Sequence, residues 1–150
     1  MSNNSVVSEL NGLIITLRDL NLLYRQSAKE ANDTALRTEL YKSAQRCASI
    51  RAQIEAEIRT LGGQPCDSPS MAGKLREIWI EIKAVFTDDD EQAVLKTCDS
   101  QQSNVADRFC RVMDDEQLPR NIREVLRPQL AKIRSIGVTI DEYAARYATS

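Results

Sequence analysis

Four cysteines are the side chains of this sequence with the greatest capacity for chemistry, because a thiolate can act as a nucleophile or bind a soft metal. They are Cys47, Cys66, Cys98 and Cys110, and no two of them have the Cys-x-x-Cys spacing of a zinc site. The 150 residues include no histidine, which excludes imidazole as a metal ligand or general base. In a reducing compartment we therefore expect free thiols that are buried or half-buried.

Carboxylates are the second group that could do chemistry. The acidic run at residues 88–91, DDDE, is typical of the first turn of a helix, where negative charge is favourable. A calcium loop is the alternative, but the alternating ligands and the internal glycine of such a loop are missing. Paired acid and base catalysis needs carboxylates that face each other in a cleft, whereas Glu55, Glu57, Glu77 and Glu81 fall at solvent-facing helical positions.

The composition indicates a single globular domain over residues 1–150. Apolar residues make up 42% of the chain and charged residues 28%, and the net charge is −2. No stretch is apolar enough to span a membrane, and no basic cluster favours nucleic acid. The first residues, MSNNSVVSEL, lack the basic start and apolar run of a secretory signal, so we expect a cytoplasmic location.

The elements that must position these side chains are all helical. Glycine and proline are few, with five and four residues, and β-branched residues occur singly. The spacing of apolar residues predicts helices over about 6–31, 34–61, 70–87, 89–114 and 119–147. We expect Asp33 to cap the second helix, Gly62-Gly63 to end it, and Pro119 to lie in the first turn of the last one. Pro128 lies inside the last helix and is expected to bend it.

The first helix is apolar on more than one side. A stripe at three- and four-residue spacing faces a core and comprises Leu10, Leu13, Ile14, Leu17, Asn21, Tyr24, Ala28 and Ala31. Ile15, Leu22 and Leu23 fall outside this stripe, which predicts a second buried contact. Either another helix of the same chain or a second copy in a homodimer can provide it.

The order of elements predicts an all-α, up-down-down-up bundle. Four long helices form two pairs, and about 25 residues with a shorter helix connect the pairs. Such a connection is long enough to cross the length of the bundle, so that the second and third long helices can run in the same direction.

Three segments resemble one known family. They are LNGLIITL near the start, LGGQPCDSPSMAGKLREIWIEIKAVF in the middle and RPQLAKIRSIGVTIDEY near the end. In this order they are similar to the bacterial ferritin-like four-helix-bundle family of unknown function, which is related in fold to the YciE and YciF stress-associated proteins. The resemblance covers nearly the whole chain, and it implies a ferritin-like fold with an extra short helix in the crossover.

The resemblance also implies where a di-metal centre would lie. In ferritin-like metal carboxylate proteins, one helix of each pair gives a Glu and the other gives a Glu-x-x-His. The positions that match these ligands are Leu17, Cys47, Ile50, Gln102, Arg134 and Gly137. None is a carboxylate or a histidine, so we expect the ligand set to be lost and the axis to be filled with apolar side chains. Gln102 and Arg134 are expected to hydrogen bond to each other or to a buried water.

These observations favour a non-catalytic bundle that acts by self-association, as a dimer, or by binding another protein, with no metal or other cofactor. The family suggests a link to stress. Two alternatives stay open. One is a degenerate or noncanonical metal-binding oxidase, and the other is a cysteine-based redox sensor in which Cys47 and Cys98 form a disulfide or bind a soft metal.

Overall fold

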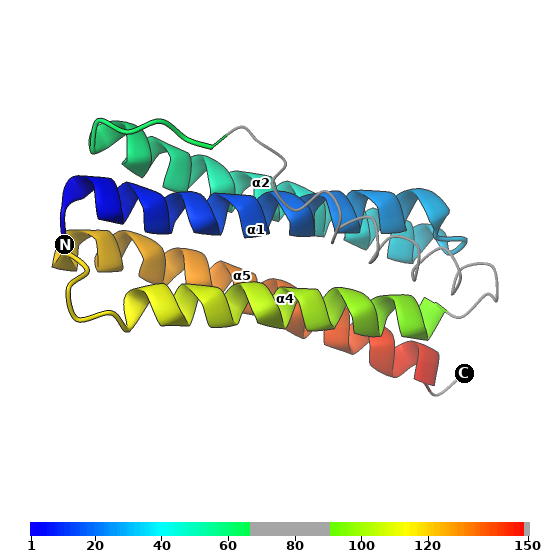
Figure 1. Cartoon of the computed structure of the whole chain (residues 1–150). Helices are drawn as coiled ribbons and strands as arrows, with labels where there is room; N and C mark the ends of the chain where they lie inside the picture. Colours follow the sequence, from blue (N-terminus) through cyan, green and yellow to red (C-terminus); the bar gives the residue numbers. More distant parts are fainter. Residues whose placement is uncertain (67–90, 149–150) are drawn as a thin grey trace.

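The computed structural model describes residues 1–66 and 91–148, which form four helices (Figure 1). They are α1 (Asn3–Glu30), α2 (Thr34–Thr60), α4 (Glu91–Met113) and α5 (Arg120–Ala148). No strand occurs in these two ranges, so the all-α prediction is confirmed for them. The short helix predicted over 70–87, and the acidic residues that precede Glu91, lie outside the described residues.

The connection between α1 and α2 is short, and side chains cap the helix ends on both sides of it. The Asp33 carboxylate accepts a hydrogen bond from the Ala35 amide at 3.0 Å, as predicted for the residue that begins α2. The Arg37 guanidinium donates to the Ala31 carbonyl at 2.7 and 3.2 Å, which satisfies a backbone oxygen at the end of α1. At the other end of α2, Gly62 has φ +81°, a conformation that favours glycine after a helix.

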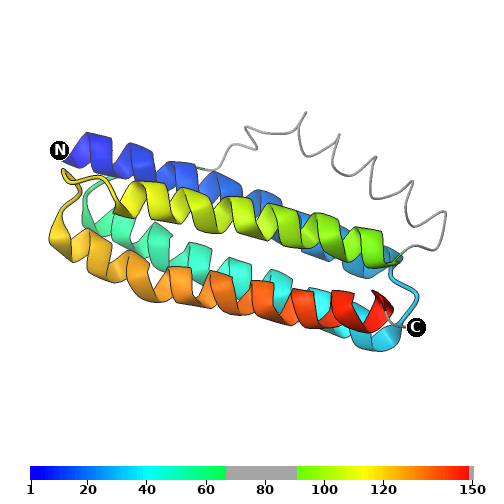
Figure 2. The same cartoon turned by 90° about the horizontal axis from the view of Figure 1, so that it is seen from below.

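The four helices run in the order up, down, down, up. Figures 1 and 2 show α1 and α5 starting at the same end of the bundle, and α2 and α4 starting at the opposite end. Each helix packs on two neighbours of opposite direction: α1 contacts α2 and α4, and α5 contacts α2 and α4. The pairs α1–α5 and α2–α4 are diagonal, and within the described ranges no Cα of one lies within 8 Å of a Cα of the other.

One continuous apolar core lies between these helices. The predicted stripe of α1 is buried, from Leu10 to Ala31, except that Asn21 is half-buried. Among the side chains expected on the outer side of α1, Leu22 is 37% exposed and Ile15 is half-buried, but Leu23 is only 3% exposed and belongs to the core. The core surrounds a wider arc of α1 than its main stripe, so Leu23 is covered by the same chain, which is one of the two alternatives for the second buried contact. No helix in the described part of the chain is both long and apolar enough to cross a bilayer.

Candidate functional site

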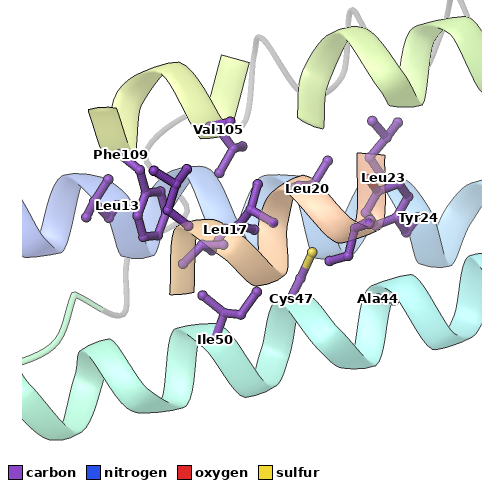
Figure 3. Packing of buried hydrophobic residues seen from close by; sticks show 14 of the residues in the cluster. Leu13, Leu17, Leu20, Leu23, Tyr24, Ala44, Cys47, Ile50, Val105 and Phe109 are labelled. Atoms are coloured by element: carbon purple, nitrogen blue, oxygen red, sulfur yellow. The ribbon is translucent and has the colours of Figure 1, made fainter. Parts of the chain in front are cut away.

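Three of the six positions that match the family ligands lie inside the bundle as apolar or weakly polar side chains. Leu17 on α1 and Cys47 and Ile50 on α2 are each at most 1% exposed. Figure 3 shows the three side chains close together in the space between the helices, with Leu13, Leu20 and Phe109 around them. This part of the axis therefore presents hydrocarbon and one thiol where a di-metal site would need anionic oxygens.

Two further positions, Gln102 and Gly137, form a close contact between α4 and α5. The Gln102 side chain is 5% exposed, and its Nε2 donates to the Ile133 carbonyl of α5 at 2.9 Å. A Cβ atom at position 137 would lie 2.5 Å from the Gln102 Oε1. Only a glycine at this point of α5 leaves room for the amide, so the contact depends on both residues.

The sixth position, Arg134, lies on the outside of the bundle, which contradicts its expected pairing with Gln102. The side chain is exposed, and its Nη2 donates to the Cys110 Sγ at 3.4 Å. The reason is helical geometry: Ile133 faces the core, and the next residue is turned by about 100°. Gln102 instead uses a backbone carbonyl as its partner.

The two buried thiols lie on α2 and α4, which are diagonally opposite in the bundle. Cys47 and Cys98 are fully buried, and burial raises the pKa of each thiol to about 12. Both are therefore neutral at ordinary pH. Since α2 and α4 have no Cα atoms within 8 Å of each other, a Cys47–Cys98 disulfide, which needs about 4.4–6.8 Å between Cα atoms, does not fit this fold. That form of the redox-sensor alternative is wrong.

Hydroxyl and thiol side chains nevertheless occur in one part of the interior, in a group we call the hydroxyl–thiol cluster: Tyr24, Ser27, Ser43, Cys47 and Cys98. All five are buried. The Ser27 Oγ and the Cys98 Sγ are 3.7 Å apart. Burial, followed by the proximity of Cys98, Cys47 and Asp99, raises the pKa of the Tyr24 phenol well above its ordinary value. The cluster is thus an uncharged polar region inside the core.

Comparison with known families finds one match. Residues 5–115 match the domain of unknown function DUF2383. The chain belongs to this family. No curated protein matches the sequence significantly. The DUF2383 match includes α1, α2 and α4 with the whole hydroxyl–thiol cluster, whereas α5 follows it. Because the family is defined without a function, the match identifies relatives and not an activity.

The C-terminal helices of this DUF2383 protein bring two carboxylates together. Asp99 on α4 and Asp141 on α5 hydrogen bond to each other. Burial, then this hydrogen bond and the negative charge of Asp141, raises the pKa of Asp99 to about 6. Sequence reasoning missed this pair, because each residue falls among polar positions of its own helix and only the packing of α4 on α5 places them opposite each other.

No group of three Cys, Asp or Glu side chains able to hold a metal occurs among residues 1–66 and 91–148.

The DUF2383 chain leaves α2 along the surface of α1. The Asn11 amide donates to the Gln64 carbonyl at 3.0 Å, and its Oδ1 accepts from the Cys66 amide at 2.7 Å. The Arg18 Nη1 donates to the Cys66 carbonyl at 3.0 Å. Cys66 is half-buried, within the range expected for the thiols. These three bonds fix the start of the connection to α4.

Proposed function

We propose that this DUF2383 protein is a ferritin-like bundle without a di-metal centre, which acts without catalysis by binding a second copy of itself or another protein. Two features of the fold support the ferritin-like assignment. The helices run up, down, down and up (Figures 1 and 2), and the connection between α2 and α4 is long enough to cross the bundle. The proposal treats residues 1–150 as one domain.

The observation that carries the proposal is the filling of the bundle axis. A di-iron centre needs several anionic oxygens inside the bundle to balance the metal charge. Leu17 and Ile50 lie there instead and are almost completely buried. Each such side chain contributes about 1.5–3 kcal/mol to folding. These positions therefore support a role in stabilising the scaffold in place of metal binding.

The outer side of α1 supports association as the mode of action. Leu22 is 37% exposed and Ile15 is half-buried, and the two lie seven residues, or about two turns, apart on the same side of the helix. We place a homodimer contact at these two residues. The cytoplasmic location and the link to stress are parts of the same proposal and derive from the sequence and its resemblance.

Metal analysis tests the loss of the di-metal centre. We expect protein purified from cells supplied with iron and manganese to contain far less than one metal ion per chain. Stoichiometric iron or manganese that stays bound through dialysis would overturn the proposal and favour a noncanonical metal oxidase.

Analytical ultracentrifugation tests association. We expect the wild-type chain to sediment as a dimer at micromolar concentration, and Leu22→Glu to shift it to the monomer. Val138→Glu is the matched control, because Val138 on α5 is also exposed, at 58%, and lies outside the proposed contact. A monomeric wild-type chain would rule out the homodimer.

A further inference from the structure

Two hydroxyl groups in the interior have no hydrogen-bond partner among the described residues. They are the Tyr24 Oη on α1 and the Ser43 Oγ on α2, and both side chains are fully buried. Buried polar atoms almost always have a partner, from the protein or from an ordered water. Two such atoms in the same half of one bundle therefore point to a shared partner of another kind.

The two hydroxyls belong to neighbouring parts of α1 and α2. Ser43 and Cys47 are four residues apart on α2, so their side chains are neighbours on one face of the helix. The Asn21 side chain on α1 donates to the Ala44 carbonyl on α2 at 2.6 Å, so the turn of α1 that contains Tyr24 lies against the turn of α2 that contains Ser43. Figure 3 shows Tyr24 on α1 facing the part of α2 that carries Ala44 and Cys47.

Small side chains surround this region. Ser27 and Ala28 lie one turn from Tyr24 on α1, and Ala44 on α2 lies near it (Figure 3); all three are small and buried. Besides burial, the thiols of Cys98 and Cys47 and then the Asp99 carboxylate raise the pKa of the Tyr24 hydroxyl. A water molecule needs two to four polar partners in an interior site, and this cluster offers hydroxyls and thiols that donate and accept.

The groups of the cluster are uncharged, which determines the class of ligand. Burial raises the pKa of Cys47 and of Cys98 to about 12, so both remain thiols. The nearest carboxylate, Asp99, is hydrogen-bonded to Asp141 at the α4–α5 contact. An ion would thus find no counter-charge within the cluster, whereas a small neutral molecule that both donates and accepts would be bound favourably.

We propose that one ordered water molecule is bound inside the bundle between the Tyr24 and Ser43 hydroxyls, beside the Cys47 thiol. The Tyr24 hydroxyl donates to the water oxygen, and the water hydrogen bonds to the Ser43 Oγ. The water links α1 to α2 one to two turns away from Leu17 and Ile50.

Urea unfolding of Tyr24→Phe tests the proposal by the sign of its effect. If the hydroxyl holds a water, its removal breaks a hydrogen bond, and we expect the unfolding equilibrium constant to rise roughly three- to tenfold. Tyr41→Phe is the matched control, because Tyr41 is 40% exposed and its hydroxyl reaches solvent. A Tyr24→Phe protein as stable as wild type, or more stable, would show that the hydroxyl was unpartnered and would overturn the proposal.

Ser43→Ala and the double variant test whether one water serves both hydroxyls. Since either substitution removes a partner of the same water, we expect the double variant to be less destabilised than the sum of the two single changes. Strictly additive losses would exclude a shared ligand. A crystal structure provides the direct observation: electron density for a water within hydrogen-bond distance of the Tyr24 Oη supports the proposal, and a hydroxyl in contact only with carbon and sulfur atoms overturns it.

Discussion

The two ends of the bundle interior differ in chemistry although the same four helices build both. One end, which we call the aliphatic end, contains the first half of α1 and α5 and the second half of α2 and α4. Its core is Leu10, Leu13, Ile54, Ile58, Phe109, Ile122 and Leu126, with one buried amide, that of Gln129. The other end, which we call the polar end, also buries aliphatic side chains such as Leu36, Leu40 and Leu95. In addition it contains the hydroxyl–thiol cluster, the Gln102–Gly137 contact and, at its rim, the Asp99–Asp141 pair.

The difference indicates that the two ends contribute differently to folding stability and to the capacity to bind a ligand. Large aliphatic and aromatic side chains contribute most of the hydrophobic free energy of folding, and they leave little that can recognise a ligand. Small polar side chains contribute less, and they create positions that require a specific partner. Of the positions that match the family ligands, Leu17 and Ile50 are buried aliphatic side chains, whereas Cys47 and Gln102 are a buried thiol and a buried amide.

The largest effect is expected at the aliphatic end. Phe109→Ala should lower the free energy of unfolding by about 3–5 kcal/mol, because it leaves a cavity in a rigid core. Cys47→Ala, at the polar end, removes one atom and should cost roughly 1 kcal/mol. Urea denaturation of both variants gives the comparison. Equal losses would show that the two ends contribute alike to stability.

Gly137→Ala tests whether the polar end is tightly packed. The new methyl group would lie 2.5 Å from the Gln102 Oε1, and we expect a loss of about 1–3 kcal/mol despite the better helix propensity of alanine. Gly12→Ala is the control on α1. Its methyl group would meet the Arg108 Nη2 at 2.7 Å, but this atom ends a flexible exposed side chain, and a gain of up to about 1 kcal/mol is expected.

Adding Gln102→Ala to Gly137→Ala should restore part of the lost stability, since it removes the group with which the methyl collides. A Gly137→Ala protein that is more stable than wild type would contradict the close contact. Thermal unfolding is sufficient to measure these differences.

The Asp99–Asp141 pair should make the polar end sensitive to pH. The folded pKa of Asp99, about 6, is above its ordinary value of 3.8. The folded state therefore binds the proton more tightly, and its contribution to stability is present below about pH 4 and is lost as the pH rises through about 6. Asp141→Asn should flatten this dependence and stabilise the protein at neutral pH, by less than about 1 kcal/mol because the pair is partly exposed.

Urea unfolding across that pH range measures the effect, and Asp107→Asn on the exposed side of α4 is the control. A wild-type stability that increases between about pH 4 and 6, with no change in Asp141→Asn, would contradict the shared hydrogen bond.

The rate at which the four cysteines react should distinguish half-buried thiols from fully buried ones. This prediction involves no change in the stability of the protein. Cys66 and Cys110 are half-buried, and Cys47 and Cys98 are buried. We expect iodoacetamide to label the first two in the native protein and the last two only after unfolding. Mass spectrometry of the labelled peptides identifies them. Rapid native labelling of Cys98 would show that the polar end opens to solvent.

The helices and most of their buried faces could be predicted from the sequence, because both follow from local spacing. Leu10, Leu13 and Leu17 recur at helical intervals and are buried, and Asp33 caps α2 as expected. Gly62 takes the positive φ predicted at the end of the same helix. Each of these features depends on a few neighbouring residues and on no distant contact.

The candidate site was less predictable, because it depends on how the helices are rotated and aligned. A shift of one residue turns a helix by about 100°, which explains why Arg134 lies outside and Leu23 inside. The proximity of Asp99 to Asp141 depends on the alignment of α4 with α5. In the sequence Tyr24 looks like an ordinary core tyrosine, and only its surroundings show that its hydroxyl has no hydrogen-bond partner among residues 1–66 and 91–148.

The amide of Gln102 has a consequence for how the C-terminal hairpin is assembled. Two helices with smooth aliphatic faces can slide past each other by a turn, about 5.4 Å, at little cost in buried area. Here such a slip would withdraw the amide from the Ile133 carbonyl and press it against a side chain larger than Gly137. The glutamine and the glycine thus favour one alignment of α4 with α5 over the alignments that are shifted by one helical turn.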